Sequence, residues 1–490
     1  MVASKYDNVG GRWASRLASV ALSCVLSVLP AVASAQEPEA DITAPVYVAK
    51  DCCTLCPKAS DPDSYATTFL KDYLYLVQGE GQWLFRTEAE LNITAQKDEL
   101  VWDDLERMVK DLNARGTQIL VYLSAPRAVV QVQRLTPEVR ARFDYDGLLK
   151  NYQGYLEHLR KVGFIVPPAD RFASVKKGED FHFQRDAHWN PSGAKRAAEL
   201  IAEYIKPLNF NFPPKTFVTK ESSVITRRGT IAFAADVICG SRYPTESSIF
   251  YETTAPATDD LFGDEPVPEI ALVGTSFSGS AEYHFMGFLR AALQTDMLQN
   301  SFAGAGFDGS ITQYLASPAF QKAPPKLIVW EFPYQFFGRA DHATMRRIVP
   351  LVNNGCVNRK ALISNEVELT NDGDYKEILF NGGSNFITEK SKNLIVDMQF
   401  SDPNVREISS EIWYLDGRHE LIRSRYNQFT NMEGRFVMEL NRAPEYADQP
   451  VVDYRLQVLT TLGKPVKVKA TMCSALEPGN AVVKSGAPAP

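Results

Sequence analysis

A change in sequence pattern near residue 347 limits what this chain can fold into. Before that point, compact apolar runs such as 117–123 and 270–273 alternate with stretches of helical periodicity. This alternation predicts an α/β domain with a mostly parallel sheet. After that point, short segments alternate apolar and polar residues between turns, which indicates a β-sandwich. We therefore expect an α/β domain over residues 36–346 and an all-β domain over 347–474.

Periodicity and turn residues also predict the elements of the α/β part. The expected strands are 117–123, 164–166, 270–273 and 326–331, and the expected helices are 65–77, 98–112, 146–162, 311–315, one after Pro191 and one near Ala281. If the strands ending at Val273 and Glu331 are parallel, the loops after them lie at one edge of the sheet, where open α/β sheets place their sites. Residues 209–260 contain Pro213-Pro214 and many Ser and Thr residues, so we expect them to be irregular.

The N-terminus has the three parts of a cleaved signal peptide. Lys5, Arg12 and Arg16 supply the positive charge, residues 17–30 are apolar, and Ala33-Ser34-Ala35 is a small-residue cleavage site. A retained membrane anchor is the alternative, but the apolar run is short for a span. No later segment is apolar for long enough to cross a bilayer, so we expect a soluble, exported protein.

The net charge restricts the partners of the mature chain. Removal of residues 1–35 takes away three basic residues and one acidic residue, which changes the formal charge from −7 to −9. Such a charge disfavours nucleic acid and anionic membranes as partners. We therefore expect no nucleic-acid partner. Residues 475–490 are expected to form a disordered tail.

Six cysteines remain after cleavage, and an even number in an exported chain indicates disulfides. Cys356 and Cys473 bracket the β segments, so we expect them to pair. Cys53 and its neighbours Cys52 and Cys56 form a cluster, one member of which is expected to reach Cys239; Cys53 is our candidate, with the connectivity left open. A redox or zinc role is the alternative, but no thioredoxin-like elements surround the cluster and no second metal-spaced pair exists.

Two motifs carry catalytic chemistry. Asp186 and His188 lie two residues apart, just before Asn190 and Pro191, which are a good N-cap and a good first residue of a helix. An Asp can hold one ring nitrogen of a His and leave the other free as a general base. Metal binding by this pair is the alternative, but no third ligand lies at a helpful spacing, so we expect no metal.

Ser276 is the candidate nucleophile. It follows the apolar strand 270–273 on a tight Gly274-Thr275-Ser276 turn, which exposes a hydroxyl at the sheet edge and lets backbone N–H groups face an oxyanion. Each motif alone is weak, since such turns are common. Together, an Asp, a His and an exposed Ser in one α/β domain predict nucleophilic acyl chemistry without a cofactor.

Four sequence blocks resemble the signature blocks of the AlgX/AlgJ family of alginate O-acetylation proteins. They are residues 81–85, 186–190, 274–278 and 330–334. The resemblance, over roughly residues 50–345, implies an SGNH-hydrolase-like domain in which the Asp-x-His block precedes the Ser block, a permuted order. The β domain with cysteines at both ends resembles the AlgX branch, whose second domain is a carbohydrate-binding module.

The resemblance also implies roles for individual residues. Ser276 would be the nucleophile, His188 the base and Asp186 its orienting acid. Tyr334 would line the site and stabilise the oxyanion or the sugar, although packing is an equal interpretation. Gly304 or Gly306 would take the place of the SGNH block Gly.

The implied function is periplasmic acetyl transfer to mannuronate residues of alginate, with the acetyl donor delivered by membrane acetylation machinery and other alginate secretion proteins as partners. In the β domain, Trp413 would stack on a sugar, and Arg418, Arg423 and Arg425 would meet uronate carboxylates. Alternatively, Trp413 is a core residue and the arginines form a solvated face. Two other functions remain open: a carbohydrate acetyl-esterase with the same triad, and a non-catalytic alginate-binding scaffold.

Overall fold

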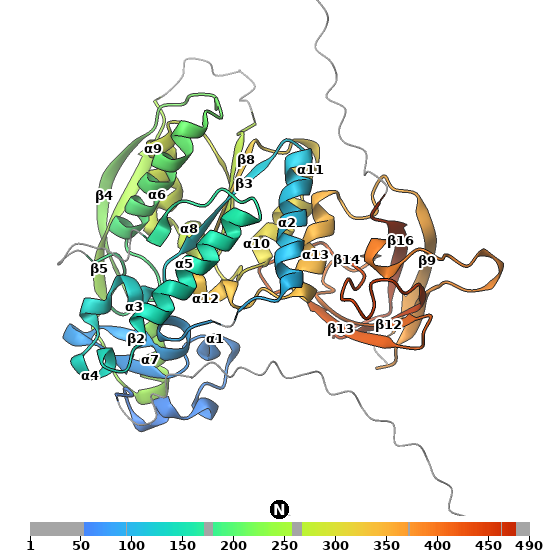
Figure 1. The fold of residues 1–490 in the computed structure, drawn as a ribbon. Coiled ribbons are helices and arrows are strands. Elements are labelled where there is room, and N and C mark those ends of the chain that lie inside the picture. Colours follow the sequence, from blue (N-terminus) through green and yellow to red (C-terminus); the bar gives the residue numbers. More distant parts are fainter. Residues whose placement is uncertain are drawn as a thin grey trace, which may run out of the picture. The chain divides into compact units, whose positions relative to one another are not determined.

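In the computed structural model of the chain, a four-stranded parallel sheet forms the centre of the first domain (Figure 1). Its strands lie in the order β3 (Gln118–Ser124), β8 (Leu327–Pro333), β6 (Ile270–Gly274) and β7 (Leu298–Ser301). All three neighbouring pairs are parallel, and every residue of β6 and β8 is buried. Strands covered on both faces are continuous apolar runs, which is why the sequence predicted β3, β6 and β8, whereas the less buried β7 was not predicted.

The structure describes residues 53–94, 96–170, 180–256, 267–370, 373–461 and 463–476. The expected signal peptide and residues 477–490 of the expected tail lie outside the described residues. Within those ranges, no helix combines the length and the apolarity that a membrane crossing requires.

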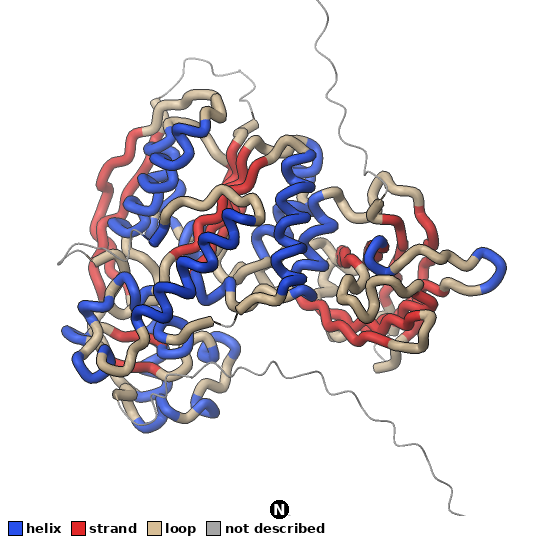
Figure 2. The backbone as a smooth tube through the Cα atoms, viewed as in Figure 1, coloured by secondary structure: helices blue, strands red, loops and turns tan. Residues whose placement is uncertain are grey.

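Helices surround the parallel sheet (Figure 2). In chain order they are α1 (Thr68–Lys71), α2 (Glu99–Ala114), α3 (Arg127–Val130), α4 (Pro137–Arg140), α5 (Tyr145–Lys161), α6 (Pro191–Ile205), α7 (Thr230–Cys239), α8 (Ser276–Gly279), α9 (Phe285–Leu293), α10 (Gly309–Ala316), α11 (Pro318–Lys322), α12 (Tyr334–Phe337) and α13 (His342–Val352). Helix α13 packs against both α2 and α10, and α6 packs against α9.

Local sequence signals determine where the long helices begin. The Asp98 carboxylate accepts the N–H of Leu100 at 3.0 Å before α2, and the Asn190 side chain accepts the N–H of Gly193 at 2.8 Å before α6. Pro191 is the first residue of α6, because a helix needs no N–H donor there. The helices expected after residues 98, 146 and 191 are therefore confirmed.

Residues 218–254 are not irregular, so the expectation for this part of the region 209–260 was wrong. They form a two-stranded antiparallel ribbon, β4 (Val218–Arg227) and β5 (Glu246–Thr254), with α7 between the strands. Most side chains of β4 are exposed, so the strand has no apolar alternation from which it could be predicted. Its stability comes from pairing with β5 rather than from burial of one face.

Two further expectations near the edges of the sheet were also wrong. The helix expected over 65–77 is reduced to α1, and β1 (Leu76–Gln78) pairs with β2 (Leu84–Arg86). Tyr75 has a positive φ of 58°, which breaks the helical path before β1. The strand expected over 164–166 contributes only one parallel bridge, between Ile165 and Leu120 of β3.

The second domain is a sandwich of two four-stranded antiparallel sheets. One sheet has the order β10 (Lys376–Phe380), β15 (Val451–Val458), β12 (Glu407–Tyr414) and β13 (His419–Arg425), and the other β14 (Arg435–Glu439), β11 (Leu394–Phe400), β16 (Val466–Ser474) and β9 (Ala361–Leu369). Buried and less buried residues alternate strictly along β12, as expected for a strand with one face in the core.

The predicted disulfide of the sandwich is confirmed. Cys356, just after α13, bonds to Cys473 in β16, with the two Cα atoms 5.7 Å apart. The expected domain boundary between residues 346 and 347 falls inside α13. The helix ends at Val352, and the first strand of the sandwich, β9, begins at Ala361.

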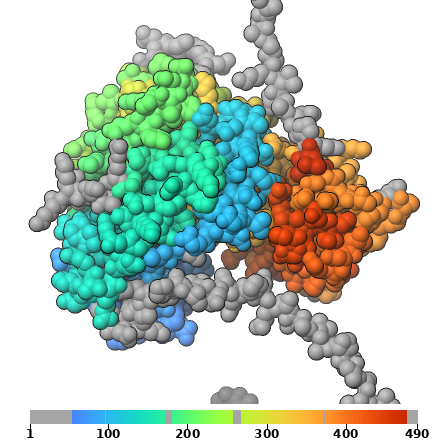
Figure 3. Space-filling model, viewed as in Figure 1, coloured from blue at the N-terminus to red at the C-terminus, as the bar shows by residue number. Residues whose placement is uncertain are grey.

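The contact between α13 and the sandwich contains buried charge. Arg346 is buried, donates to the backbone oxygen of Glu439 at 2.8 Å and pairs with the carboxylate of Glu420. Arg107 of α2 also pairs with Glu439. In the space-filling view, the blue surface of α2 accordingly adjoins the orange and red surface of the sandwich (Figure 3).

The second disulfide differs from our candidate pairing. Cys239, the last residue of α7, bonds to Cys56, with the Cα atoms 5.9 Å apart. Cys53 is disulfide-bonded but not to Cys239. Cys56 immediately precedes a short 3₁₀ helix that packs against α7, which places it rather than Cys53 beside Cys239.

Candidate active site

The side chains of Ser276, His188 and Asp186 form one hydrogen-bonded chain. The Ser276 Oγ lies 2.7 Å from Nε2 of His188, and Nδ1 of His188 lies 2.6 Å from Oδ1 of Asp186. His188 also donates its backbone N–H to the same Asp186 oxygen at 2.9 Å. The two motifs predicted from the sequence therefore meet at the edge of the sheet, with the spacing that general-base activation of a hydroxyl requires.

The end of β6 positions Ser276. Thr275 is the N-cap of α8, and its hydroxyl accepts the N–H of Phe277, so Ser276 is the first residue of the helix. Among the described residues, none accepts a hydrogen bond from the N–H of Ser276, which leaves this donor for an oxyanion. A side chain at Gly274 would lie 2.7 Å from the Glu331 carboxylate, so this position requires glycine.

Glu331 of β8 lies beneath this turn and is buried. Its carboxylate accepts the N–H of Thr275 at 3.0 Å, the Thr275 hydroxyl, and the hydroxyl of Ser278 at 2.8 Å. Burial raises the pKa of Glu331 to about 7, although these hydrogen bonds act in the opposite direction. The sequence predicts a strand at Glu331 but no role for its side chain; an acid at the end of a buried strand is the signal that could have indicated one.

Arg127 fixes the backbone of the segment that carries Asp186 and His188. Its buried guanidinium donates to the backbone oxygens of Phe183 and Gln184 at 2.8 Å each. The same group donates to the backbone oxygen of Leu84 at 2.7 Å and pairs with the carboxylate of Glu90 at 3.2 Å. No sequence motif indicated this role for Arg127.

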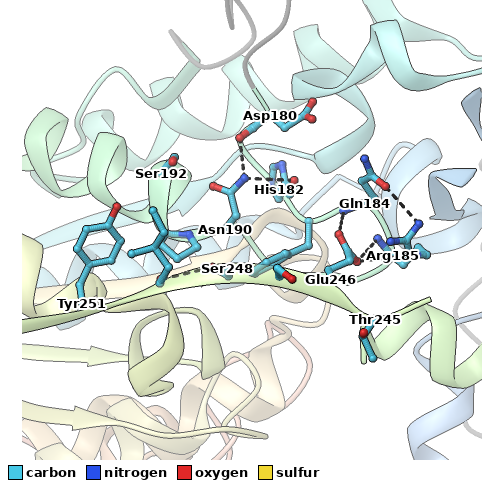
Figure 4. A pocket seen from close by; sticks show the side chains of 14 residues that line it. Asp180, His182, Gln184, Arg185, Asn190, Ser192, Thr245, Glu246, Ser248 and Tyr251 are labelled. Carbon is cyan, nitrogen blue, oxygen red and sulfur yellow. Dashed lines mark hydrogen bonds and ion pairs between the residues drawn. The ribbon is translucent and has the colours of Figure 1, made fainter. Parts of the chain in front are cut away.

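Glu246 of β5 holds the same segment from another side. Its carboxylate accepts the backbone N–H groups of Gln184 and Arg185 at 2.8 and 2.9 Å (Figure 4). A pocket of about 460 Å³ lies between this segment, the start of α6 and β5, and Figure 4 shows the side chains that line it. Neither Ser276 nor His188 lines it, so this pocket is separate from the Ser276–His188–Asp186 hydrogen-bonded chain.

The second oxygen of Asp186 has partners of its own. Oδ2 accepts a hydrogen bond from Arg227 of β4 at 3.0 Å and the N–H of Thr230 at 2.7 Å. Burial alone would raise the pKa of Asp186, but His188, Arg227 and the Thr230 N–H outweigh it and hold this pKa well below its usual range. Arg227 and Thr230 lie in the segment expected to be irregular, which is why the sequence did not reveal them.

Tyr334 does not belong with these catalytic atoms. It is buried at the start of α12, accepts the N–H of Thr94 at 3.0 Å and donates its hydroxyl to Asn151. Its single proton is therefore already used, and it packs against Tyr152 and Tyr155. The structure favours the packing interpretation over an oxyanion or sugar contact.

Gly304 and Gly306 lie in the loop after β7, and both have positive φ angles, 78° and 66°. Phe302 in this loop donates its N–H to the backbone oxygen of Gly274 at 3.3 Å, so the loop lies beside the Ser276 turn. Either glycine remains a candidate for the SGNH block Gly. No group of three or more His, Cys, Asp or Glu residues with metal-binding geometry occurs in the described part of the chain.

The residues predicted to bind carbohydrate lie in the sandwich. Trp413 is half-buried on the outward side of β12 and stacks on His419 of β13, with ring centroids 4.6 Å apart. Arg418 is exposed in the turn between these strands and pairs with Asp416. These residues form a surface of their own, outside the triad.

The fold and the triad define a class: an SGNH-hydrolase-like domain followed by a carbohydrate-binding module. The family model described as SGNH hydrolase-like domain, acetyltransferase AlgX, matches residues 76–334, and one described as C-terminal carbohydrate-binding module matches residues 355–485. The alginate biosynthesis protein AlgX of Azotobacter vinelandii is 33% identical over 474 residues, which cover 95% of this chain and 97% of the relative. The chain belongs to the AlgX family.

Two other comparisons agree with this assignment. A solved structure of Pseudomonas aeruginosa AlgX superposes with a TM-score of 0.76 and 32% identity, covering 86% of this chain and 99% of that one. The probable alginate O-acetylase AlgJ of Pseudomonas aeruginosa is 29% identical over 284 residues, covering 54% of this chain and 71% of the relative.

Proposed function

We propose that this protein is an exported O-acetyltransferase that acetylates mannuronate residues of alginate through an acetyl-Ser276 intermediate. The observation that carries the proposal is the hydrogen-bonded chain from Ser276 through His188 to Asp186. The proposed substrate, alginate, is supported by the protein's membership of the AlgX family and by relatives that are named for alginate biosynthesis and alginate O-acetylation.

In the first half-reaction, Nε2 of His188 accepts the hydroxyl proton of Ser276 as Oγ attacks the carbonyl carbon of the acetyl donor. Asp186 accepts a hydrogen bond from Nδ1 and stabilises the imidazolium that forms. When the carbonyl re-forms, the bond to the leaving group breaks, and His188 gives the proton to that group. The product is an ester between the acetyl group and Ser276.

In the second half-reaction, a mannuronate hydroxyl gives its proton to His188 and attacks the acetyl-Ser276 carbonyl. The proton then returns to Ser276 Oγ as the acetyl group leaves on the sugar. In both halves, the free N–H of Ser276 and the glycine loop after β7 are suited to stabilise the tetrahedral oxyanion. Because water can replace the sugar, the outcome depends on polymer bound near the acyl group.

The sandwich provides a reason for sugar to compete with water. A polymer held on the module, with Trp413 against a sugar ring and Arg418 near a carboxylate, raises the local concentration of acceptor hydroxyls. The proposed location is the periplasm, after cleavage at residue 35. We further propose that membrane acetylation machinery delivers the acetyl donor and that other alginate secretion proteins are partners.

The experiment is mass spectrometry of the protein after exposure to a chromogenic acetyl ester, followed by incubation with mannuronan oligosaccharides. We expect an acetyl group on Ser276 and then acetylated sugar, and neither in Ser276→Ala. Ser280→Ala, which removes a hydroxyl four residues away, is the matched control and should behave like the wild type. Release of acetate without acetylated sugar would identify an esterase instead, and unchanged alginate acetylation in cells carrying Ser276→Ala would identify a scaffold.

A further inference from the structure

Arg227 has the most direct contact with the triad of any side chain outside it. Oδ1 of Asp186 receives the two hydrogen bonds from His188, whereas Oδ2 lies 3.0 Å from Nη2 of Arg227. The carboxylate thus stands between the imidazole and a guanidinium. Arg227 is largely buried, with a side-chain exposure of 12%, so water screens its charge only weakly.

Aromatic rings link Arg227 to His188 by a second route. The guanidinium carbon lies 4.8 Å from the ring centre of Phe183 and 5.1 Å from that of Tyr283. The same Tyr283 ring stacks on the imidazole of His188, with centroids 5.0 Å apart and planes at 25°. Because the guanidinium packs on the ring that supports the imidazole, it limits how both the ring and the imidazole can tilt.

The end of the β4–β5 ribbon places Arg227 beside Asp186. Arg227 is the last residue of β4 and lies opposite Glu246, the first residue of β5. Glu246 in turn accepts the N–H groups of Gln184 and Arg185 (Figure 4). The base of the β4–β5 ribbon therefore fixes both the backbone before Asp186 and the cation behind it.

We propose that Arg227 is a positioning residue that orients Asp186 and His188 and, by its charge, weakens the binding of a proton to this pair. The inference rests on the proposed function only for its kinetic readout. The positive charge of the guanidinium, beside the carboxylate, opposes the gain of a further positive charge by the Asp186–His188 pair.

Other charged and titratable groups face the pair and contribute to its protonation. They come from several elements and are Tyr73, Arg127, His182, Glu282 and Tyr283. Glu282 pairs with Arg227 at 3.2 Å and partly offsets its charge. Arg227 differs from the remaining groups in that it hydrogen-bonds the catalytic carboxylate itself.

The test is the pH profile of kcat/KM for release of the chromophore from an acetyl ester. In Arg227→Gln the pair loses a neighbouring positive charge and binds a proton more readily. We expect the acid limb of the profile to move upward by about one pH unit, while Arg227→Lys keeps a profile close to that of the wild type. Glu282→Gln removes a negative charge near the Asp186–His188 pair and should move the acid limb of the profile to lower pH.

Arg228→Gln is the matched control, since Arg228 is adjacent but points to Asp236 on α7 and is more exposed. Its profile should equal that of the wild type. If Arg227→Gln lowers the rate equally at every pH and leaves the limb in place, the charge role is wrong and Arg227 serves only packing. If Arg227→Gln does not fold, the Glu282→Gln profile decides the question by the same criterion.

A readout without activity separates this inference from the proposed function. The imidazole resonances of His188, assigned by comparison with His188→Gln, can be titrated by NMR in the wild type and in Arg227→Gln. We expect the midpoint to be higher in the variant. An unchanged midpoint would overturn the inference even in an active enzyme, whereas a raised midpoint in a protein that forms no acetyl-Ser276 would preserve it and reject the proposed function.

Discussion

The carboxylate of Glu331 accepts the amide N–H of Thr275 at 3.0 Å, one residue before the proposed nucleophile Ser276. It also accepts the hydroxyl of Ser278 at 2.8 Å, so it holds the turn on both sides of Ser276. Buried donors with a single acceptor are costly to leave unpaired. Glu331 therefore maintains the shape of the nucleophile turn from inside the sheet.

Glu331→Gln should change how stability depends on pH. The pKa of Glu331 is raised by burial to about 7, so the folded protein binds this proton more tightly than the unfolded chain. The resulting stabilisation is complete below pH 4.5 and is lost as the pH rises through 7. Between pH 5 and pH 8, urea unfolding should show the wild type losing about 2–3 kcal/mol relative to Glu331→Gln.

The same variant should lower kcat by about tenfold. The NH2 group of the new glutamine side chain faces a donor of Thr275 or Ser278 where the carboxylate had an acceptor, and this disturbs the turn. Glu269→Gln, at the opposite end of β6 and paired with Lys326 near the surface, is the control. It should leave both the pH dependence and kcat unchanged. If the free energy of unfolding depends on pH in the same way in the wild type and in Glu331→Gln, Glu331 does not bind the additional proton in the folded protein.

Arg127→Met should destabilise the fold and the catalytic segment together. The change leaves the buried backbone oxygens of Leu84 and Phe183 without this donor, takes one of two donors from the oxygen of Gln184, and leaves Glu90 with one partner fewer. We expect the free energy of unfolding in guanidinium chloride to fall by about 3–5 kcal/mol, with a loss of acetyl-Ser276 formation. Arg134→Gln breaks a partly exposed pair with Asp180 and should cost less than about 1 kcal/mol. Equal losses in the two variants would refute the role of Arg127.

The Cys356–Cys473 disulfide should stabilise the sandwich without affecting the chemistry. It closes a segment with a sequence separation of 117, so its removal frees a long loop in the unfolded chain. Chain-entropy arguments give a loss of about 5 kcal/mol for Cys356→Ser combined with Cys473→Ser. Denaturant unfolding of the double variant beside the wild type, both without a reductant, measures this loss, and acetylation of Ser276 by the chromogenic ester should persist in the folded variant. Loss of acetylation at full folding would show that the bridge also supports the site.

The sequence was sufficient for the elements whose signals are local. Strand β6 is apolar throughout, β8 is apolar apart from Glu331, and α6 begins at an Asn-Pro pair, so the places of Ser276 and His188 could be predicted. The Asp186-x-His188 motif and the Ser276 turn lie together because the parallel strands and the start of α6 determine where the loops that carry them leave the sheet. The resemblance to a known family then supplied their roles.

The supporting residues could not be predicted, because their signals are not local. Arg227 and Glu246 lie on a ribbon whose strands are mostly exposed and show no apolar periodicity. Arg127 looks like any helical arginine until the fold brings three backbone oxygens to it. Tyr334 shows the opposite case: it belongs to a signature block, yet its hydroxyl bonds to Thr94 and Asn151 and is not available to a substrate.

Trp413→Ala should separate polymer binding from acyl chemistry. Trp413 lies on the outward side of β12 and stacks on His419, in a different sheet from the one that carries Ser276. Loss of one aromatic platform costs about 1 kcal/mol or slightly more, so we expect the KM for mannuronan oligosaccharides to rise about tenfold. The rate of chromophore release from a small acetyl ester should stay the same, because that reaction needs only the triad.

Leu421→Ala is the matched control for this prediction, because Leu421 is an exposed apolar residue on the adjacent strand β13 and makes no stacking contact with Trp413. It should leave the KM for the oligosaccharide unchanged. If both variants raise KM equally, the effect is a general one of the sheet surface rather than of the aromatic ring. If Trp413→Ala instead lowers ester turnover while oligosaccharide KM is constant, Trp413 is a core residue whose removal disturbs the whole protein, and the sugar-binding surface must be sought elsewhere.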